Sequence, residues 1–215
     1  MKKIMLLMAA LFACQTADAG NWFVGAGLGS ARAKDASQNA AANSSTLARY
    51  GINDITAHDD NSGALAIFGG YRFSRHVAAE LAYTYLGSYS MHGFTSPAPT
   101  LPAGREENRV DALSLAAVFT APIDNSFSLY GKLGPTITTN EERTCISNIW
   151  WCDSTSDVKT GLVFGVGGSV SFPGLIGKLR LEADRFNHVG DSSNEYTAGR
   201  FTLLQLQYVY AFPNR

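Results

Sequence analysis

The last run of the chain, residues 197–212, constrains the fold more than any other stretch, because its side chains alternate between two kinds. From Leu204 onward one set of alternate positions is apolar and aromatic, whereas the other set includes Gln205 and Gln207. A period of two indicates a β-strand with one apolar and one polar environment. A soluble protein buries the apolar face, but a membrane barrel turns it toward lipid. The aromatic end of the run favours a strand that closes a bacterial outer-membrane barrel.

The overall composition agrees with a membrane barrel. Charged residues make up 16% of the chain, compared with about 25% in a typical soluble domain. The mean hydropathy is −0.03, which excludes a bundle of membrane helices but suits strands whose lipid-facing and lumen-facing residues alternate. The formal net charge of −1 provides no basic field for nucleic acid, so we expect none to bind.

Residues 1–19 have the pattern of a secretory signal peptide. Lys2 and Lys3 precede an apolar core over residues 4–13, and Ala17-Asp18-Ala19 is a cleavage site of small residues. The apolar core is too short to span a bilayer. We therefore expect a mature outer-membrane domain over residues 20–215.

Three cysteines bear on processing and on the mature fold. Cys14, after Leu11-Phe12-Ala13, offers an alternative lipidation site, but the bulky Phe12 and the better cleavage site downstream argue against it. Removal of the leader leaves Cys145 and Cys152. An even pair in an exported protein predicts a disulfide, and with no histidine near the pair we expect no metal there.

Eight runs with period-two alternation predict eight strands. Glycine at every second position of the first run would leave room inside a narrow barrel for larger side chains from other strands. The predicted strands cover residues 21–30, 64–73, 77–86, 110–121, 126–137, 158–171, 178–186 and 197–212. The connections alternate between long loops, at 31–63, 87–108, 138–156 and 187–196, and short turns, at 74–76, 122–125 and 172–177.

This pattern predicts an all-β fold, an eight-stranded antiparallel up-and-down transmembrane β-barrel. Outer-membrane barrels have short periplasmic turns and long extracellular loops, so both termini are expected in the periplasm. The alternative is a lipocalin-like soluble barrel, which would bury the apolar faces and leave the opposite, charged faces outside. Tyrosines at the strand ends suit an interfacial belt and favour the membrane barrel.

Four stretches carry a family resemblance: NWFVGAGLGS, AAELAYTYLG, SLYGKLGP and RLEADRFNHVGDSSNEYTAGRFTLLQLQYVYAF. They resemble the OmpA-like transmembrane domain, which belongs to a wider set of small barrels that includes OmpX and opacity-type proteins. The resemblance implies an outer-membrane protein that the barrel-assembly machinery inserts. Full-length OmpA proteins continue into a peptidoglycan-binding domain, but this chain stops at Arg215, so we do not extend cell-wall tethering to it.

Charged residues on the inward parity are the first candidate site. Eight strands enclose an interior that side chains can fill, and buried charges must pair there. We expect these residues to form a polar plug, with Glu80 and Lys132 as one pair; the alternative is a gated ion path, which the resemblance permits. An apolar, OmpW-like conduit is disfavoured by these charges. The inward set is Arg72, Glu80, Lys132, Lys159, Arg180, Glu182 and Asp184.

Two further groups are candidate contact residues on the outside. Arg109, Arg185 and Arg200 have outward parity near the extracellular strand ends, where arginine would bind lipopolysaccharide phosphates; ordinary snorkelling is the alternative. Trp150 and Trp151 lie in the loop that the disulfide would close, and they either form a contact surface or pack within the loop.

The sequence gives little support for catalysis. A barrel lipid A deacylase would show His-x-Ser on a late strand, but His188 is followed by Val189-Gly190, and Ser192 and Ser193 lie in the next loop. The other histidines have no evident partner; they are His58, His76 and His92. We therefore expect a non-enzymatic monomer without cofactor or metal, with a structural or surface-interaction role and loops suited to host or phage contact. The alternative is a narrow channel for ions or small solutes.

Overall fold

The structure, a computed structural model, describes residues 21–34, 52–58, 61–95, 102–146, 151–172, 174, 176–189 and 199–213. The predicted signal peptide and the predicted domain boundary at residues 19 and 20 lie outside this part of the chain. None of the described residues belongs to a helix with the length and apolarity needed to cross a membrane.

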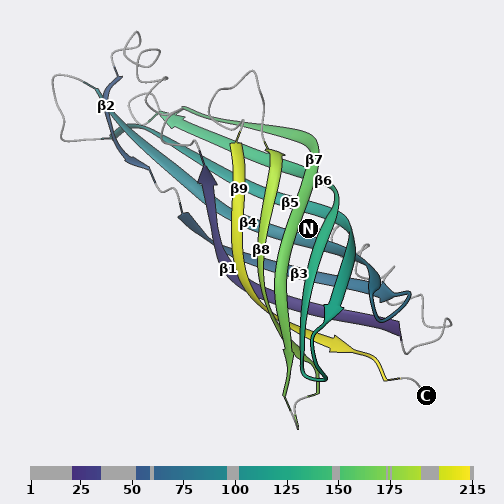
Figure 1. The fold of residues 1–215 in the computed structure, drawn as a ribbon. Coiled ribbons are helices and arrows are strands. Elements are labelled where there is room, and N and C mark those ends of the chain that lie inside the picture. The colour runs from purple at the N-terminus through teal and green to yellow at the C-terminus, as the bar shows by residue number, and fades with distance from the viewer. Residues whose placement is uncertain are drawn as a thin grey trace.

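The described chain forms one antiparallel sheet that closes on itself (Figure 1). β1 pairs with both β3 and β9, and the β4–β5 pairing completes the wall. β2 pairs with β4 beyond the part of β4 that β3 occupies, so β2 and β3 share one place in the wall. The predicted eight-stranded barrel is therefore confirmed. The strands are β1 (Trp22–Lys34), β2 (Ile52–His58), β3 (Asn61–Arg72), β4 (Val77–Thr95), β5 (Pro102–Pro122), β6 (Phe127–Ile146), β7 (Trp151–Ser171), β8 (Lys178–Val189) and β9 (Gly199–Ala211).

The predicted inward and outward faces are confirmed on every barrel strand. On β9, Leu204 and Leu206 are each 55% exposed, whereas Gln205 and Gln207 are buried. The exposed apolar residues of the other strands form the same outer belt, as expected for a wall that faces lipid. The inward glycines of the first run make room for side chains of other strands, as predicted: a Cβ at Gly25 would collide with the Phe68 ring.

The β3–β4 and β5–β6 turns form where they were predicted, and side chains accept hydrogen bonds from their backbone. In the β5–β6 turn the Asp124 carboxylate accepts hydrogen bonds from the backbone N–H groups of Ser126 (2.7 Å) and Phe127 (2.6 Å), which holds the pKa of Asp124 below its ordinary value. The start of β1 lies at this same end of the barrel, where the Phe212 N–H donates to the Trp22 carbonyl. The beginning of β1 and the end of β9 therefore share the short-turn end.

Two of the predicted long loops are wrong, because much of 87–108 and 138–156 is strand. β4 runs to Thr95 and β5 begins at Pro102, while β6 runs to Ile146 and β7 begins at Trp151. Part of the predicted loop 31–63 is also strand, in β1, β2 and β3. Above the apolar belt both faces of a strand can meet water, so no apolar period marks these segments, although backbone pairing continues.

The extensions make the wall taller on one side than on the other (Figure 1). β7 last pairs with β8 at Leu162 and continues, paired only with β6, to Trp151. β8 ends at Val189 and β9 begins at Gly199. We call β4–β7 the tall side and β8, β9 and β1 the low side.

Candidate functional site: a charged layer inside the barrel

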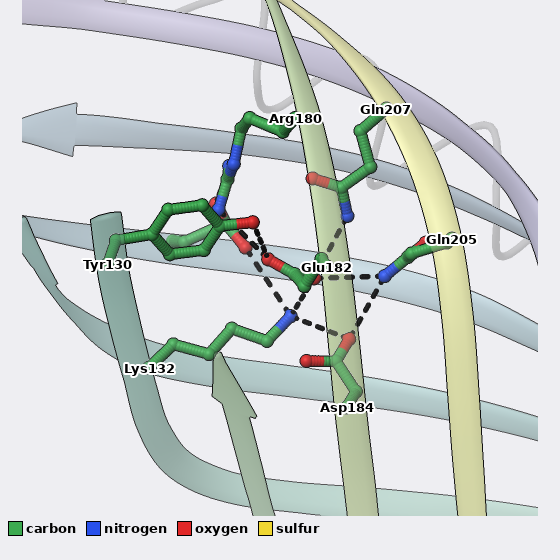
Figure 2. Close-up of polar contacts among 8 residues, drawn as sticks. Tyr130, Lys132, Arg180, Glu182, Asp184, Gln205 and Gln207 are labelled. Carbon is green, nitrogen blue, oxygen red and sulfur yellow. Dashed lines mark hydrogen bonds and ion pairs between the residues drawn. The ribbon is translucent and has the colours of Figure 1, made fainter. Parts of the chain in front are cut away.

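A group of polar side chains that contact one another lies inside the barrel (Figure 2). Inward positions of four strands supply it, and the sheet register brings them together: Lys132 on β6 lies opposite Gly165 on β7, which lies opposite Asp184 on β8. The small glycine between them leaves space for both side chains. We call this set the charged layer: Glu80, Tyr130, Lys132, Arg180, Glu182, Asp184, Gln205 and Gln207.

Glu182 is the centre of the charged layer and is 0% exposed. One of its oxygens accepts from the Lys132 ammonium at 2.6 Å and from the amides of Gln205 and Gln207, each at 2.9 Å. The other oxygen accepts from the Tyr130 hydroxyl at 2.7 Å and from Arg180 at 3.0 Å. A buried carboxylate needs such compensation, because charged groups lose much of their hydration inside a protein.

The two buried cations join the other carboxylates to Glu182. Arg180 donates to Glu80 at 2.8 Å, and its guanidinium stacks over the Tyr130 ring at 4.2 Å. Lys132 lies 3.0 Å from Asp184 and 3.8 Å from Glu80. The distance between Glu80 and Lys132, the predicted pair, is thus the longest ion-pair distance in the layer. Glu80 lies closer to Arg180.

The charged layer contains three carboxylates and two cations, all between 0% and 7% exposed. In the charged layer, Oε1 of Glu80, Oδ1 of Asp184 and Oε1 of Gln207 have no hydrogen-bond partner among the described residues. Glu182 therefore has the most hydrogen bonds in the layer, whereas Glu80, Asp184 and Gln207 each keep one oxygen without a hydrogen bond.

The other two predicted members of the inward set lie away from the layer. Arg72 is near the short-turn end, with its guanidinium 6.0 Å from the centre of the Phe23 ring. Lys159 lies opposite Thr138, toward the far end of β7. Sequence parity placed both residues on the inward face, but it did not give their heights.

Apolar clusters lie above and below the charged layer, and the sequence analysis did not predict them. The lower cluster extends from the charged layer toward the short turns: Tyr130 belongs to both, and Arg180 lies 5.3 Å from the centre of the Phe68 ring. Its members are Phe23, Phe68, Ala78, Ala82, Val118, Tyr130 and Val209. The upper cluster is Ala31, Ala64, Leu86, Val110, Ala112, Val163, Phe186, Phe201 and Leu203. These residues have inward parity, which is the signal that could have revealed them. The interior is thus a charged layer between two apolar ones.

The three predicted outward arginines are exposed, but the structure does not bring all three together. Arg185 on β8 and Arg200 on β9 are on adjacent strands of the low side. Arg109 is on β5, on the tall side, where it forms an ion pair with Asp111 at 3.2 Å and lies over the Tyr85 ring at 5.2 Å. Arg32 on β1, which the sequence analysis had placed in a loop, is also exposed and outward.

The predicted disulfide between Cys145 and Cys152 is confirmed, and it joins directly opposed residues of β6 and β7. Trp151 is the first residue of β7, although its side chain is outside the described part of the structure, as is all of Trp150. The disulfide therefore fixes the far end of the β6–β7 hairpin.

The remaining histidines are dispersed. His76 is in the short β3–β4 turn, where its Nδ1 lies 3.1 Å from the Thr120 carbonyl oxygen. His58, His92 and His188 lie in β2, β4 and β8, while Ser192 and Ser193 are outside the described residues. In the described segments no group of three or more His, Cys, Asp or Glu residues is placed to hold a metal ion.

Comparisons with known proteins agree with this architecture. The family model of the OmpA-like transmembrane domain matches residues 17–215. Similar solved structures include Ail, the attachment invasion locus protein of Yersinia pestis, at 15% identity, covering 89% of this chain and 99% of Ail, with a TM-score of 0.50. Neisserial surface protein A is similar at 13% identity, covering 89% of this chain and 97% of that one, with a TM-score of 0.54. No curated protein sequence matches. The chain belongs to the OmpA-like transmembrane domain family and is a small β-barrel protein of the bacterial outer membrane.

Proposed function

We propose that this protein is a closed outer-membrane barrel with a structural role, and that its tall side presents a surface for interaction outside the cell. The proposal of a closed lumen rests on the interior, in which a charged layer lies between two apolar clusters. The charged layer is almost completely buried, and an apolar cluster lies on each side of it.

Each interior layer opposes ion passage in a different way. An ion in either apolar cluster would lose its hydration without gaining polar partners, which costs several kcal/mol or more. In the charged layer an ion would have to displace contacts such as those of Lys132 and Arg180 with Glu182, at 2.6 and 3.0 Å. The two apolar clusters and the charged layer together therefore favour a closed lumen over an ion channel.

The tall side supports the interaction role. The outermost part of the β6–β7 hairpin is polar and exposed, with Glu141, Arg143, Thr155 and Ser156 open to solvent. The disulfide closes the hairpin, which limits the conformational entropy that a partner would have to remove on binding. A paired, rigid, polar sheet of this kind is suited to contact a protein or glycan ligand from a host or a phage.

The narrow channel remains the alternative proposal, and one feature of the charged layer favours it. The layer holds more carboxylates than cations, and two carboxylate oxygens have no hydrogen-bond partner among the described residues. A cation would be attracted to such a site if both apolar clusters could open.

Planar-bilayer conductance of the refolded mature chain tests the proposal, with a heat-dependent gel shift to show that the barrel has formed. We expect a heat-modifiable band and no discrete openings. Glu80→Ala removes one carboxylate of the charged layer but leaves both apolar clusters intact, so it should remain silent. Reproducible openings in the unmodified protein, or openings created by Glu80→Ala, would instead support the channel.

A further inference from the structure

The low side of the barrel carries three exposed, outward arginines on three adjacent strands. Arg32 lies on β1, Arg185 on β8 and Arg200 on β9. Arg32 and Arg185 are the two cross-strand partners of Thr202. Since opposed Cα atoms are about 5 Å apart in antiparallel sheets, these two arginines are about 10 Å apart, with Arg200 about 7 Å along β9 from Thr202. We call this group the arginine triangle.

No acidic side chain balances the arginine triangle within its own strands. The acidic residues of β1, β8 and β9 are Glu182 and Asp184 alone, and both are buried in the interior. The outer neighbours in β3 and β7 are uncharged: Asn61 lies opposite Arg32, and Phe164 lies opposite Arg185. Arg109 on the tall side differs, because Asp111 neutralises it.

The arginine triangle lies where the apolar belt ends. Two outward positions closer to the short turns, along β1 and β9, lie Leu28, 68% exposed, and Leu204, 55% exposed. With the short turns in the periplasm, as in outer-membrane barrels generally, the triangle is at the level of the outer-leaflet headgroups. A single arginine at this height would be explained by snorkelling. Three neighbouring cations with no acidic partner among the described residues repel one another, and an anionic ligand would remove that cost.

We propose that the arginine triangle binds phosphate groups of lipopolysaccharide in the outer leaflet. The planar guanidinium can donate two parallel hydrogen bonds to phosphate, which makes arginine well suited to this ligand. Three such groups, spread over about 10 Å of the barrel wall, match a headgroup that carries more than one phosphate. The inference rests on the outer-membrane location of the protein and does not depend on whether the lumen conducts.

The test compares two double variants that each remove two positive charges from the outer surface. R32Q/R185Q breaks the arginine triangle, whereas R109Q/R143Q removes exposed arginines of β5 and β6 on the tall side. The folded mature protein is titrated with purified lipopolysaccharide, with dephosphorylated lipopolysaccharide and with phosphatidylglycerol vesicles. The readouts are the apparent affinity and the rise in the temperature of the gel shift, since a ligand that binds the folded state stabilises it.

We expect R32Q/R185Q to bind lipopolysaccharide at least about tenfold more weakly, because it loses hydrogen bonds between charged groups, and R109Q/R143Q to bind it like the unmodified protein. A second variant, R32K/R185K, keeps the charges without the planar donors and should show an intermediate loss. Dephosphorylated lipopolysaccharide and phosphatidylglycerol should bind weakly to all forms. Unchanged affinity in R32Q/R185Q, equal losses in both glutamine variants, or equally tight binding of phosphatidylglycerol or dephosphorylated lipopolysaccharide would overturn the proposal.

Discussion

Arginines inside and outside the barrel wall differ in how their charges are balanced. Arg180 is buried, donates to Glu80 and Glu182 at 2.8 and 3.0 Å, and stacks over Tyr130. Arg200 is exposed on the neighbouring strand β9, whose described residues include no acidic side chain. The difference arises from parity, because inward residues of several strands converge across the lumen whereas outward residues diverge. The interior charges therefore have ion-pair partners, whereas the low-side arginines have no acidic partner among the described residues.

The largest loss in the free energy of unfolding should follow from a substitution at the centre of the charged layer. Glu182→Gln places an amide where five donors now meet a carboxylate. It removes one of the two carboxylates, the other being Glu80, that pair with both Lys132 and Arg180. Breaking a buried ion pair in this way costs about 3–5 kcal/mol. Denaturant unfolding in lipid or detergent micelles, followed by the gel shift, measures it.

Asp184→Asn is the matched control for that prediction. Asp184 accepts from Gln205 and pairs with Lys132, but its second oxygen has no hydrogen-bond partner among the described residues. The substitution also leaves two carboxylates with two cations in the layer, so the loss should be below about 2 kcal/mol. If Asp184→Asn proved as damaging as Glu182→Gln, Glu182 would not be the centre of the layer.

An intermediate effect is expected at the outer end of the tall side. Replacing both Cys145 and Cys152 by serine should make opening of the β6–β7 hairpin easier by roughly 2–3 kcal/mol in the chain-entropy model. Limited proteolysis should cut the hairpin faster, while the gel-shift temperature of the barrel stays nearly constant. A large fall in the barrel's own stability would show that the hairpin end and the membrane wall unfold together.

A smaller loss of stability should follow when a methyl group is added inside the barrel. Gly165→Ala brings a Cβ into collision with Asp184 and within 2.8 Å of the Lys132 side chain, and overpacking of this kind costs about 1–3 kcal/mol. Gly131→Ala is the control, because its Cβ would meet only the Gly165 carbonyl at 3.7 Å. Equal stability of the two variants would contradict the close packing of the charged layer.

The smallest effect on stability is expected outside. Without lipopolysaccharide, R32Q/R185Q should unfold within about 0.5 kcal/mol of the unmodified protein, as surface substitutions usually do. The same unfolding assay provides the comparison with Glu182→Gln. Strong destabilisation would mean that these arginines support the wall instead of remaining available to a ligand.

The sequence predicted the faces of the barrel well, because parity is a local property of each strand. It predicted the inward charges at Glu80 and Arg180 but not their pairing, since 100 positions separate them and the closed register brings them together. Arg32 was missed because its segment lacks an apolar period, and β1 extends through it by pairing with β9. The apolar clusters were missed because parity does not reveal which inward residues share a height.

The most direct test of the closed interior is the reactivity of a single thiol within it. Ser114→Cys places a thiol on the inward face of β5, at a position 4% exposed, while Ser156→Cys places one at an exposed position of β7. A chain produced from residue 20 contains Cys145 and Cys152 as its native cysteines, and these are joined to each other, so only the introduced thiol reacts. A charged thiol reagent should modify Ser156→Cys rapidly and Ser114→Cys only after unfolding. Comparable modification of both thiols in the folded barrel would show that water and ions reach the interior, and would contradict the closed barrel.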